Sequence, residues 1–242
     1  MSGPRFLLFP LFLSSPPSMF GTLPDVQENW SGVMRAILCI GDSNTWGYIP
    51  GIGGRYPRHL RWVHVAERLL PDDCWCVEAG LNGRRFAEED PDAPGRSGLR
   101  AVPLLLMALP RPVAVVVMLG TNDLKRQFGK RPTAVADDAR LLLKELLSFN
   151  IPRERVILVA PPTLGSAADS DEHSSFFGRR KDSEKLSLAL ESTARREAVA
   201  FLGGAEWLSS ETADGVHLDR PGHQALGERV GGALKRILEA TR

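Results

Sequence analysis

The sequence predicts a three-layer α/β domain, a sandwich in which helices flank a mostly parallel sheet of five strands. Apolar runs with the length of strands alternate about five times with stretches of helical spacing, and no internal repeat or linker interrupts them. Residues 113–119 are almost continuously apolar and rich in valine, which is typical of a central parallel strand covered on both faces. The composition, 43% apolar and 24% charged over 242 residues, suits one such domain.

Each element is predicted from its own local pattern. Apolar runs bounded by turn residues predict strands at residues 36–40, 74–79, 113–119, 155–160 and 200–202. Helical spacing of apolar residues predicts helices at residues 61–70, 97–109 (interrupted near Pro103), 133–147 and 182–196. A final helix is predicted after Asp219, which is a suitable N-cap, with Pro221 in the first turn. The polar segment 166–177 is predicted to be a loop that forms a mobile rim.

Residues 1–33 are predicted to be an extension outside the fold, which leaves residues 34–242 as the domain. The apolar run at residues 6–13 is interrupted by Pro10 and is too short to span a bilayer. The run has a weak basic end and no small-x-small cleavage site. We therefore expect a cytoplasmic protein; secretion is the alternative, if residues 1–33 act as a signal peptide.

The charge balance argues against a nucleic-acid surface. Lys plus Arg number 30 and Asp plus Glu number 29, so the net charge of +1 supplies no basic field. The three cysteines (Cys39, Cys74 and Cys76) are odd in number, and no second Cys or His cluster completes a zinc site. This pattern favours free thiols over a disulfide framework or a metal centre.

A serine follows the first predicted strand directly. Residues 41–47 read GDSNTWG, and Ser43 lies where the buried strand ends and polar, glycine-flanked sequence begins. Such a serine is well placed as a nucleophile, because the strand holds its backbone while the loop leaves its hydroxyl accessible. An Asp-Ser-Asn turn that merely ends the strand has the same sequence, so the motif alone leaves both interpretations open.

Three other candidate residues lie in loops at the same predicted edge of the sheet. In parallel sheets ligands bind outside the carboxyl ends of the strands, so we expect Ser43, Gly83, Asn122 and His217 to meet there. Acyl transfer requires a nucleophile, a base, a group that orients the base and donors for the oxyanion. Ser43 is the candidate nucleophile and His217 the base, with Asp214 three residues earlier as its orienting group. The backbone N–H groups of Ser43 and Gly83 and the side-chain amide of Asn122 are the candidate oxyanion donors. A surface histidine and ordinary turn residues are the alternative interpretation of the same positions.

These blocks, taken together, resemble the SGNH (GDSL) hydrolases. They are GDS at residues 41–43, GLNG at 80–83, GTND at 120–123 and DGVH at 214–217, in the family's order. The opening GDSNTWG is similar to that of the bacterial arylesterase and acyltransferase branch, and the resemblance extends from about Arg35 to the end of the chain. It implies a flavodoxin-like SGNH hydrolase fold with no metal and no cofactor. It also implies that Ser43, Asp214 and His217 form a triad and that Ser43, Gly83 and Asn122 form the oxyanion hole.

The resemblance implies a serine carboxylic ester hydrolase that acts on short-chain acyl esters of the aryl acetate type through an acyl-enzyme, with acyl transfer to alcohols or peroxide as a further activity. Trp46, Asn82 and Val216 are the predicted substrate-pocket residues. Small-molecule acyl esters are the expected partners, with no nucleic acid, no stable membrane insertion and a tendency toward homo-oligomers. Two alternatives stay open: a thioesterase or lysophospholipase for longer acyl chains, and a non-catalytic ligand-binding α/β protein, which the missing phosphate-binding loop disfavours.

Overall fold

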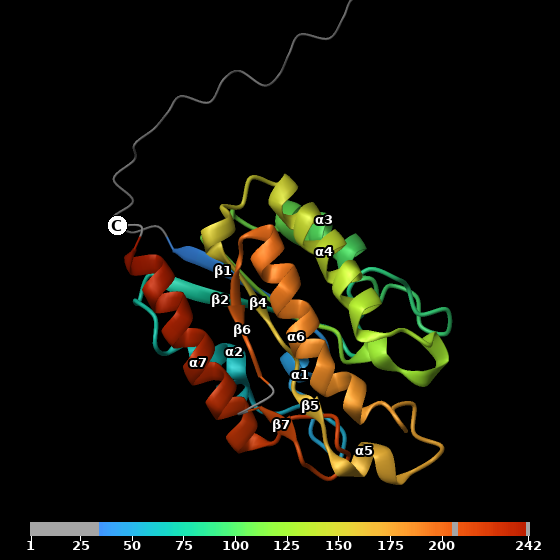
Figure 1. Cartoon of the computed structure of the whole chain (residues 1–242). Helices are drawn as coiled ribbons and strands as arrows, with labels where there is room; N and C mark the ends of the chain where they lie inside the picture. Colours follow the sequence, from blue (N-terminus) through green and yellow to red (C-terminus); the bar gives the residue numbers. More distant parts are fainter. Residues whose placement is uncertain (1–33, 205–207, 241–242) are drawn as a thin grey trace, which may run out of the picture. The chain divides into compact units, whose positions relative to one another are not determined.

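The computed structural model describes residues 34–204 and 208–240, which form an α/β body with a central parallel sheet (Figure 1). The predicted extension at residues 1–33 lies outside the described residues. The strands of the main sheet are β1 (Arg35–Gly41), β2 (Cys74–Gly80), β3 (Ala114–Met118), β4 (Val156–Val159) and β6 (Ala200–Leu202). They pair in the order β2-β1-β3-β4-β6, and every pairing is parallel. The predicted five-stranded parallel sheet of the flavodoxin-like type is therefore confirmed.

Helices cover both faces of the sheet, which explains why its central strands are apolar throughout. The helices are α1 (Ser43–Trp46), α2 (Trp62–Glu67), α3 (Gly98–Ala108), α4 (Pro132–Ser148), α5 (Ser166–Ser170), α6 (Arg180–Glu197) and α7 (Arg220–Glu239). Residues of α3, α4 and α6 pack on one face with Leu38, Val115 and Leu158, and residues of α2 and α7 pack on the other with Ile37 and Val116 (Figure 1). Every residue of β3 is buried, as a central parallel strand requires.

The ends of three neighbouring strands are in register at the edge where the candidate site lies. Gly41, the last residue of β1, pairs with Gly80 at the end of β2 and with Met118 at the end of β3. The loops that follow these strands carry residues 42–47, 81–86 and 119–123, so the parallel register places them side by side at the carboxyl edge. Short 3₁₀ turns lie in or near the connections: η1 (Arg58–Leu60), η2 (Asn122–Leu124), η3 (Arg126–Phe128) and η4 (Arg153–Arg155).

Two predictions about local structure were wrong. Helix α3 runs through Pro103 without interruption, although an interior proline removes an N–H donor and crowds the carbonyl four residues earlier. Residues 166–170 form helix α5 instead of loop, and the segment before it forms a second, two-stranded parallel sheet of β5 (Thr163–Leu164) with β7 (Ser209–Ser210). Helix α5 and the β5–β7 pair depend on contacts with residues distant in sequence, and no local pattern reveals those contacts. Among the helices of the described residues, none has the length and apolarity needed to cross a membrane.

Candidate active site

Ser43 is the first residue of a one-turn helix that follows β1 without an intervening loop. Asp42 caps this turn, since its carboxylate accepts a hydrogen bond of 2.9 Å from the N–H of Asn44. Gly41 has to be glycine, because a Cβ there would lie 1.9 Å from Oγ1 of Thr45. The tight turn out of a buried strand therefore fixes the backbone of Ser43, and only 7% of the residue's surface is exposed.

The structure brings Ser43, His217 and Asp214 together in one chain of hydrogen bonds. Oγ of Ser43 lies 2.9 Å from Nε2 of His217, and Nδ1 of His217 lies 2.8 Å from Oδ2 of Asp214. An ionised carboxylate only accepts hydrogen bonds, so Nδ1 carries the proton and Nε2 is free to accept from the serine hydroxyl. This is the arrangement that activates a serine for attack on a carbonyl carbon.

Asp214 is held in its charged form by its neighbours. Burial alone raises the pKa of this carboxyl, but hydrogen bonds from the His217 ring and from the N–H groups of His217 and Val216 outweigh burial and hold the pKa well below its usual range. Both N–H groups donate to Oδ1 at 3.0 Å. The carboxylate therefore stays ionised across the neutral pH range and stabilises one orientation and one tautomer of His217.

Two contacts from the loop after α1 also reach this pair, and the sequence analysis did not single them out. The ring of Tyr48 lies 4.2 Å from the ring of His217, centroid to centroid, at an interplanar angle of 34°. The N–H of Gly51 donates to Oδ2 of Asp214 at 3.2 Å. The only available signal was proximity to the GDSNTWG block, because a ring contact across 169 positions leaves no trace in local sequence.

The candidate oxyanion donors lie on the loops that adjoin Ser43. The loop after β2 is joined to β1 by a hydrogen bond of 3.1 Å from the N–H of Leu81 to the carbonyl of Gly41. Gly83 in this loop has a φ of 79°, a left-handed conformation that favours glycine. Within the described part of the chain, the backbone N–H groups of Ser43 and Gly83 donate to no protein acceptor. Both donors are therefore available to a substrate oxygen.

Asn122 begins the turn η2 directly beyond β3, and its side chain is held between two neighbouring loops. Nδ2 of Asn122 donates to the carbonyl of Arg84 at 3.2 Å and to Oδ2 of Asp42 at 3.4 Å. The second contact is long for a hydrogen bond, so one of the two N–H groups is only weakly engaged. Burial raises the pKa of Asp42 to about 6, although the N–H of Asn44 and the charges of His217 and Arg84 oppose this.

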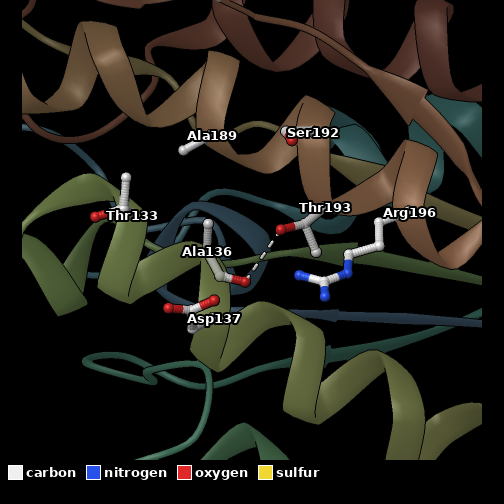
Figure 2. Close-up of a pocket in the computed structure, with 7 residues that line it drawn as sticks. All are labelled: Thr133, Ala136, Asp137, Ala189, Ser192, Thr193 and Arg196. Atoms are coloured by element: carbon white, nitrogen blue, oxygen red, sulfur yellow. Dashed lines mark hydrogen bonds between the residues drawn. The ribbon is translucent and has the colours of Figure 1, made fainter.

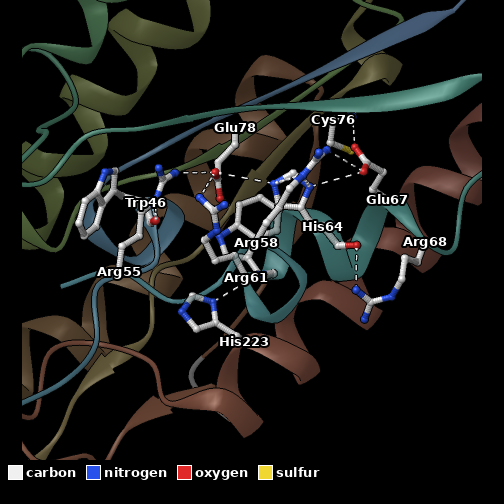
Figure 3. Close-up of polar contacts among 11 residues, drawn as sticks. Trp46, Arg55, Arg58, Arg61, His64, Glu67, Arg68, Cys76, Glu78 and His223 are labelled. Carbon is white, nitrogen blue, oxygen red and sulfur yellow. Dashed lines mark hydrogen bonds and ion pairs between the residues drawn. The ribbon is translucent and has the colours of Figure 1, made fainter. Parts of the chain in front are cut away.

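Trp46, a predicted pocket residue, is anchored by an ion-pair cluster centred on Glu78 (Figure 3). Nε of Arg55 donates to the carbonyl of Trp46 at 2.7 Å, and the guanidinium lies 5.0 Å from the centre of the indole ring. Glu78, whose side chain is 9% exposed, pairs with Arg55 at 2.6 Å and with the buried Arg61. A carboxylate this buried requires such partners, so the cluster holds the C-terminal end of α1 on β2.

The other two predicted pocket residues have different surroundings. Oδ1 of Asn82 is buried and has no hydrogen-bond partner within the described residues, which leaves an acceptor in the loop that carries Gly83. The side chain of Val216 packs in a small apolar cluster with Leu164, Ala168 and Phe176. No hydrogen bond or ring contact joins the side chain of Trp46 or Asn82 to Ser43 or His217 among these residues, although the Tyr48 ring lies between Trp46 and His217, 6.5 Å from the indole.

The surroundings of His64 and a cavity between α4 and α6 also contain polar side chains. His64 also has carboxylate neighbours, Glu67 at 3.5 Å and Glu78 at 3.8 Å, but in the described structure no hydroxyl or thiol hydrogen-bonds to its ring (Figure 3). A cavity of about 170 Å³ lies between α4 and α6 (Figure 2), lined by Thr133, Ala136, Asp137, Ala189, Ser192, Thr193 and Arg196. It contains hydroxyls but no histidine or cysteine, and Oγ1 of Thr193 is already bonded to the carbonyl of Ala136 at 3.2 Å. Neither place combines a nucleophile with a base.

Comparison with known proteins agrees with this geometry. The model of the GDSL-like lipase/acylhydrolase family matches residues 39–225. Est24, a carbohydrate acetylesterase from Sinorhizobium meliloti, has 30% sequence identity and a TM-score of 0.79, with 84% of this chain and 99% of that chain covered. The aryl esterase of M. smegmatis has 27% identity and a TM-score of 0.78 over the same shares of the two chains. A lipase/acylhydrolase from Enterococcus faecalis shares the fold at 19% identity and a TM-score of 0.61, over 84% of this chain and 96% of that one.

No curated protein sequence matched the chain. The family model nevertheless covers well over half of it, and its match begins inside β1 and ends inside α7. It therefore spans all the residues that the structure brings together around Ser43 and His217. The chain belongs to the GDSL-like lipase/acylhydrolase family and is a carboxylic ester hydrolase.

Proposed function

We propose that this chain is a serine esterase that hydrolyses short-chain acyl esters, such as aryl acetates, through an acyl-enzyme. The observation that carries the proposal is the continuous hydrogen-bond chain from Ser43 through His217 to Asp214, at 2.9 and 2.8 Å. A serine and a histidine can lie in contact by chance, but a chance contact would not also place an ionised carboxylate on the other ring nitrogen of the histidine. Here that group accepts three backbone N–H bonds besides the bond from the ring, as an orienting carboxylate needs.

The first half-reaction would use the three side chains in sequence. Nε2 of His217 takes the hydroxyl proton while Oγ of Ser43 forms a bond to the ester carbonyl carbon, whose oxygen becomes an oxyanion. The N–H groups of Ser43 and Gly83 and the weakly engaged N–H of Asn122 are the proposed donors to that oxygen. Removal of one such donor typically lowers kcat by about 10²–10³-fold. His217 then gives its proton to the leaving alcohol, and the acyl group remains on Ser43.

The second half-reaction repeats the same chemistry with water. His217 removes a proton from the water molecule, the hydroxide oxygen bonds to the acyl carbon, and the Ser43 oxygen leaves with the proton. An alcohol or a peroxide in place of water would give acyl transfer in place of hydrolysis. Product ratios in mixtures of water and alcohol measure which acceptor the site prefers.

The preference for a short acyl group rests on the names of the structural neighbours. The carbohydrate acetylesterase names acetate as its acyl group, and the aryl esterase names an aryl alcohol part. We therefore propose an acetyl ester with an aryl alcohol as the first substrate class. An acetylated carbohydrate is the second candidate, because the neighbour of that name is 30% identical to this chain.

The test compares p-nitrophenyl acetate with p-nitrophenyl octanoate for the wild type, Ser43→Ala and the control Ser170→Ala, which alters an exposed serine of α5. We expect the wild type and the control to prefer acetate. We expect Ser43→Ala to lose at least about 10⁴-fold in kcat, because the nucleophile of a triad is not replaceable. Retained activity in Ser43→Ala would exclude the acyl-enzyme. A preference for octanoate would keep the triad and move the substrate to longer chains or thioesters.

A further inference from the structure

Asn44 directly follows the candidate nucleophile, and its side chain reaches the segment that carries the candidate base. It is 1% exposed and lies in the same helical turn as Ser43. Its Oδ1 accepts from the N–H of Leu218 at 2.8 Å, and its Nδ2 donates to the carbonyl of Val216 at 3.2 Å. These partners are the residues immediately before and after His217. One amide side chain thus holds both peptide groups that flank the histidine.

The segment with Asp214 and His217 has few other connections to β1 and α1. It follows β7, which pairs only with β5 and not with the main sheet, so no sheet ladder links it to Ser43. In the described part of the chain, the other hydrogen bonds from residues 212–218 to residues 35–55 are Ser43 with His217 and Gly51 with Asp214. Asn44 therefore supplies two of the four hydrogen bonds that connect the segment of the base to the segment of the nucleophile.

We propose that Asn44 is a positioning residue that sets the distance and direction between Oγ of Ser43 and Nε2 of His217. The inference rests on the proposed function, since it assigns Asn44 to the alignment of that triad. The backbone N–H of Asn44 donates to the Asp42 carboxylate at 2.9 Å. The N-cap that holds Ser43 therefore also fixes the position of Asn44. Both of its hydrogen-bonding atoms are taken up by the loop, so Asn44 contributes to the chemical step and not to substrate binding.

A purely structural role is the competing explanation, and Ser210 provides the matched control. Oγ of Ser210 donates to the same carbonyl of Val216 at 3.0 Å, and Ser210 is also fully buried. It belongs to the same stretch of chain as Val216, only six positions earlier. Ser210→Ala thus removes a buried hydrogen bond from the same acceptor without loosening the link to Ser43.

The experiment measures kcat and KM for p-nitrophenyl acetate, the rate of Ser43 labelling by a fluorophosphonate, and Tm for three variants. Asn44→Leu removes both hydrogen bonds and keeps the number and branching of the side-chain heavy atoms. Asn44→Asp keeps an acceptor for the N–H of Leu218, replaces the amide donor to Val216 by a carboxyl oxygen and adds a buried carboxyl group. We expect kcat and the labelling rate to fall by about 100-fold in Asn44→Leu, because misplacement of a catalytic group by about 1 Å costs that much. We expect a loss of about 10-fold in Asn44→Asp, with KM within twofold of wild type in both.

Ser210→Ala is expected to keep kcat and the labelling rate within threefold of wild type, even where its Tm falls as far as that of the Asn44 variants. The inference is overturned if both Asn44 variants keep kcat within threefold. It is also overturned if kcat falls in all three variants in proportion to Tm. If Asn44→Leu does not fold, Asn44→Asp decides alone, since its buried N–H partner stays satisfied. An active Ser43→Ala would refute the proposed function itself, whereas an inactive Ser43→Ala beside fully active Asn44 variants would refute only the positioning role.

Discussion

At the carboxyl edge of the sheet, three aspartates acquire different electrostatic properties from their surroundings. Hydrogen bonds keep the pKa of Asp214 low, whereas burial raises the pKa of Asp42 to about 6 and that of Asp123 to about 7. Asp123 is completely buried. The charge of Arg85, whose Nε is 3.7 Å away, and the hydrogen bond from the N–H of Phe86 oppose the rise of its pKa only in part. Near neutral pH only Asp214 is fully ionised. The residue type sets the ordinary pKa, and the burial of each carboxylate together with the donors around it decides its charge.

His223 leads to a prediction on the pH dependence of stability. It is fully buried, with Nδ1 accepting from the N–H of Trp62 at 3.3 Å, and burial, with the charges of Arg61 and His217, lowers its pKa to about 4. The unfolded chain has a histidine pKa of about 6.5, so it binds more protons than the native state between pH 6.5 and 4. The contribution of His223 is therefore complete above pH 6.5 and is lost as the pH falls toward 4, by up to about 3 kcal/mol.

The measurement is urea unfolding between pH 7 and pH 4 for the wild type, His223→Gln and His173→Gln. We expect the stability difference between the wild type and His223→Gln to shrink by up to about 3 kcal/mol as the pH falls, because glutamine does not titrate in this range. His173 is the control, since its side chain is 89% exposed, and its variant should follow the wild type. Equal pH slopes for the wild type and His223→Gln would show that His223 is not the group that titrates.

At the scale of elements, the long helices and α2 were predicted, whereas the shortest elements were not. Helix α7 begins after Asp219, whose side chain caps the N–H of Gly222 at 2.8 Å, and Pro221 lies in its first turn, as the sequence indicated. Helix α4 was predicted within one residue of its observed ends. Long helices average their pattern over several turns, so one misassigned residue does not hide them. Helix α1 and the pair β5 and β7 have no such pattern, because two to four residues cannot display a period.

The contact between α2 and α7 depends on glycine and yields a matched pair of variants. A Cβ at Gly227 would lie 2.4 Å from Cβ of Val65 and 2.7 Å from the carbonyl of Trp62, whereas a Cβ at Gly232 in the same helix would have 3.9 Å to its nearest neighbour, Arg236. We expect Gly227→Ala to lower the free energy of unfolding by about 1–3 kcal/mol through overpacking. We expect Gly232→Ala to raise it by about 0.5–1 kcal/mol through helix propensity. Chemical denaturation measures both, and a stabilised Gly227→Ala would contradict the close packing.

At the scale of the whole molecule, topology assembles the site from distant segments. Ser43 follows the second strand of the sheet order, Gly83 and Asn122 follow its two neighbours, and Asp214 and His217 precede the last helix. Parallel strands direct their carboxyl ends to one edge, where the loops that carry Ser43, Gly83 and Asn122 converge. The loop that carries His217, 174 positions from Ser43, reaches that edge from outside the main sheet. The hydrogen bond between Ser43 and His217 therefore forms only when distant segments have packed together, whereas the bond between His217 and Asp214 joins residues three positions apart.

The extent of the family match leads to a prediction about the first 33 residues. The match begins at residue 39, and 84% of this chain covers 99% of the length of the aryl esterase and of Est24. We expect a chain that starts at Met34 to keep the Tm and the kcat for p-nitrophenyl acetate of the full chain, because the family match lies entirely after residue 33. A shortened chain with a Tm lower by several degrees would instead place residues 1–33 in the fold.

The sequence by itself determined the class of fold, the order of the main strands and helices, and the candidates Ser43, Asp214 and His217. These follow from local periodicity and from short motifs, which can be recognised without knowing which distant residues lie nearby in the fold. Only the tertiary structure showed the Asn44 amide on both sides of His217, the Tyr48 ring against the imidazole and the Gly51 N–H on Asp214. Each of these contacts joins residues more than 160 positions apart. Their relative placement is set by the parallel sheet and the packing around it, and no local pattern encodes it.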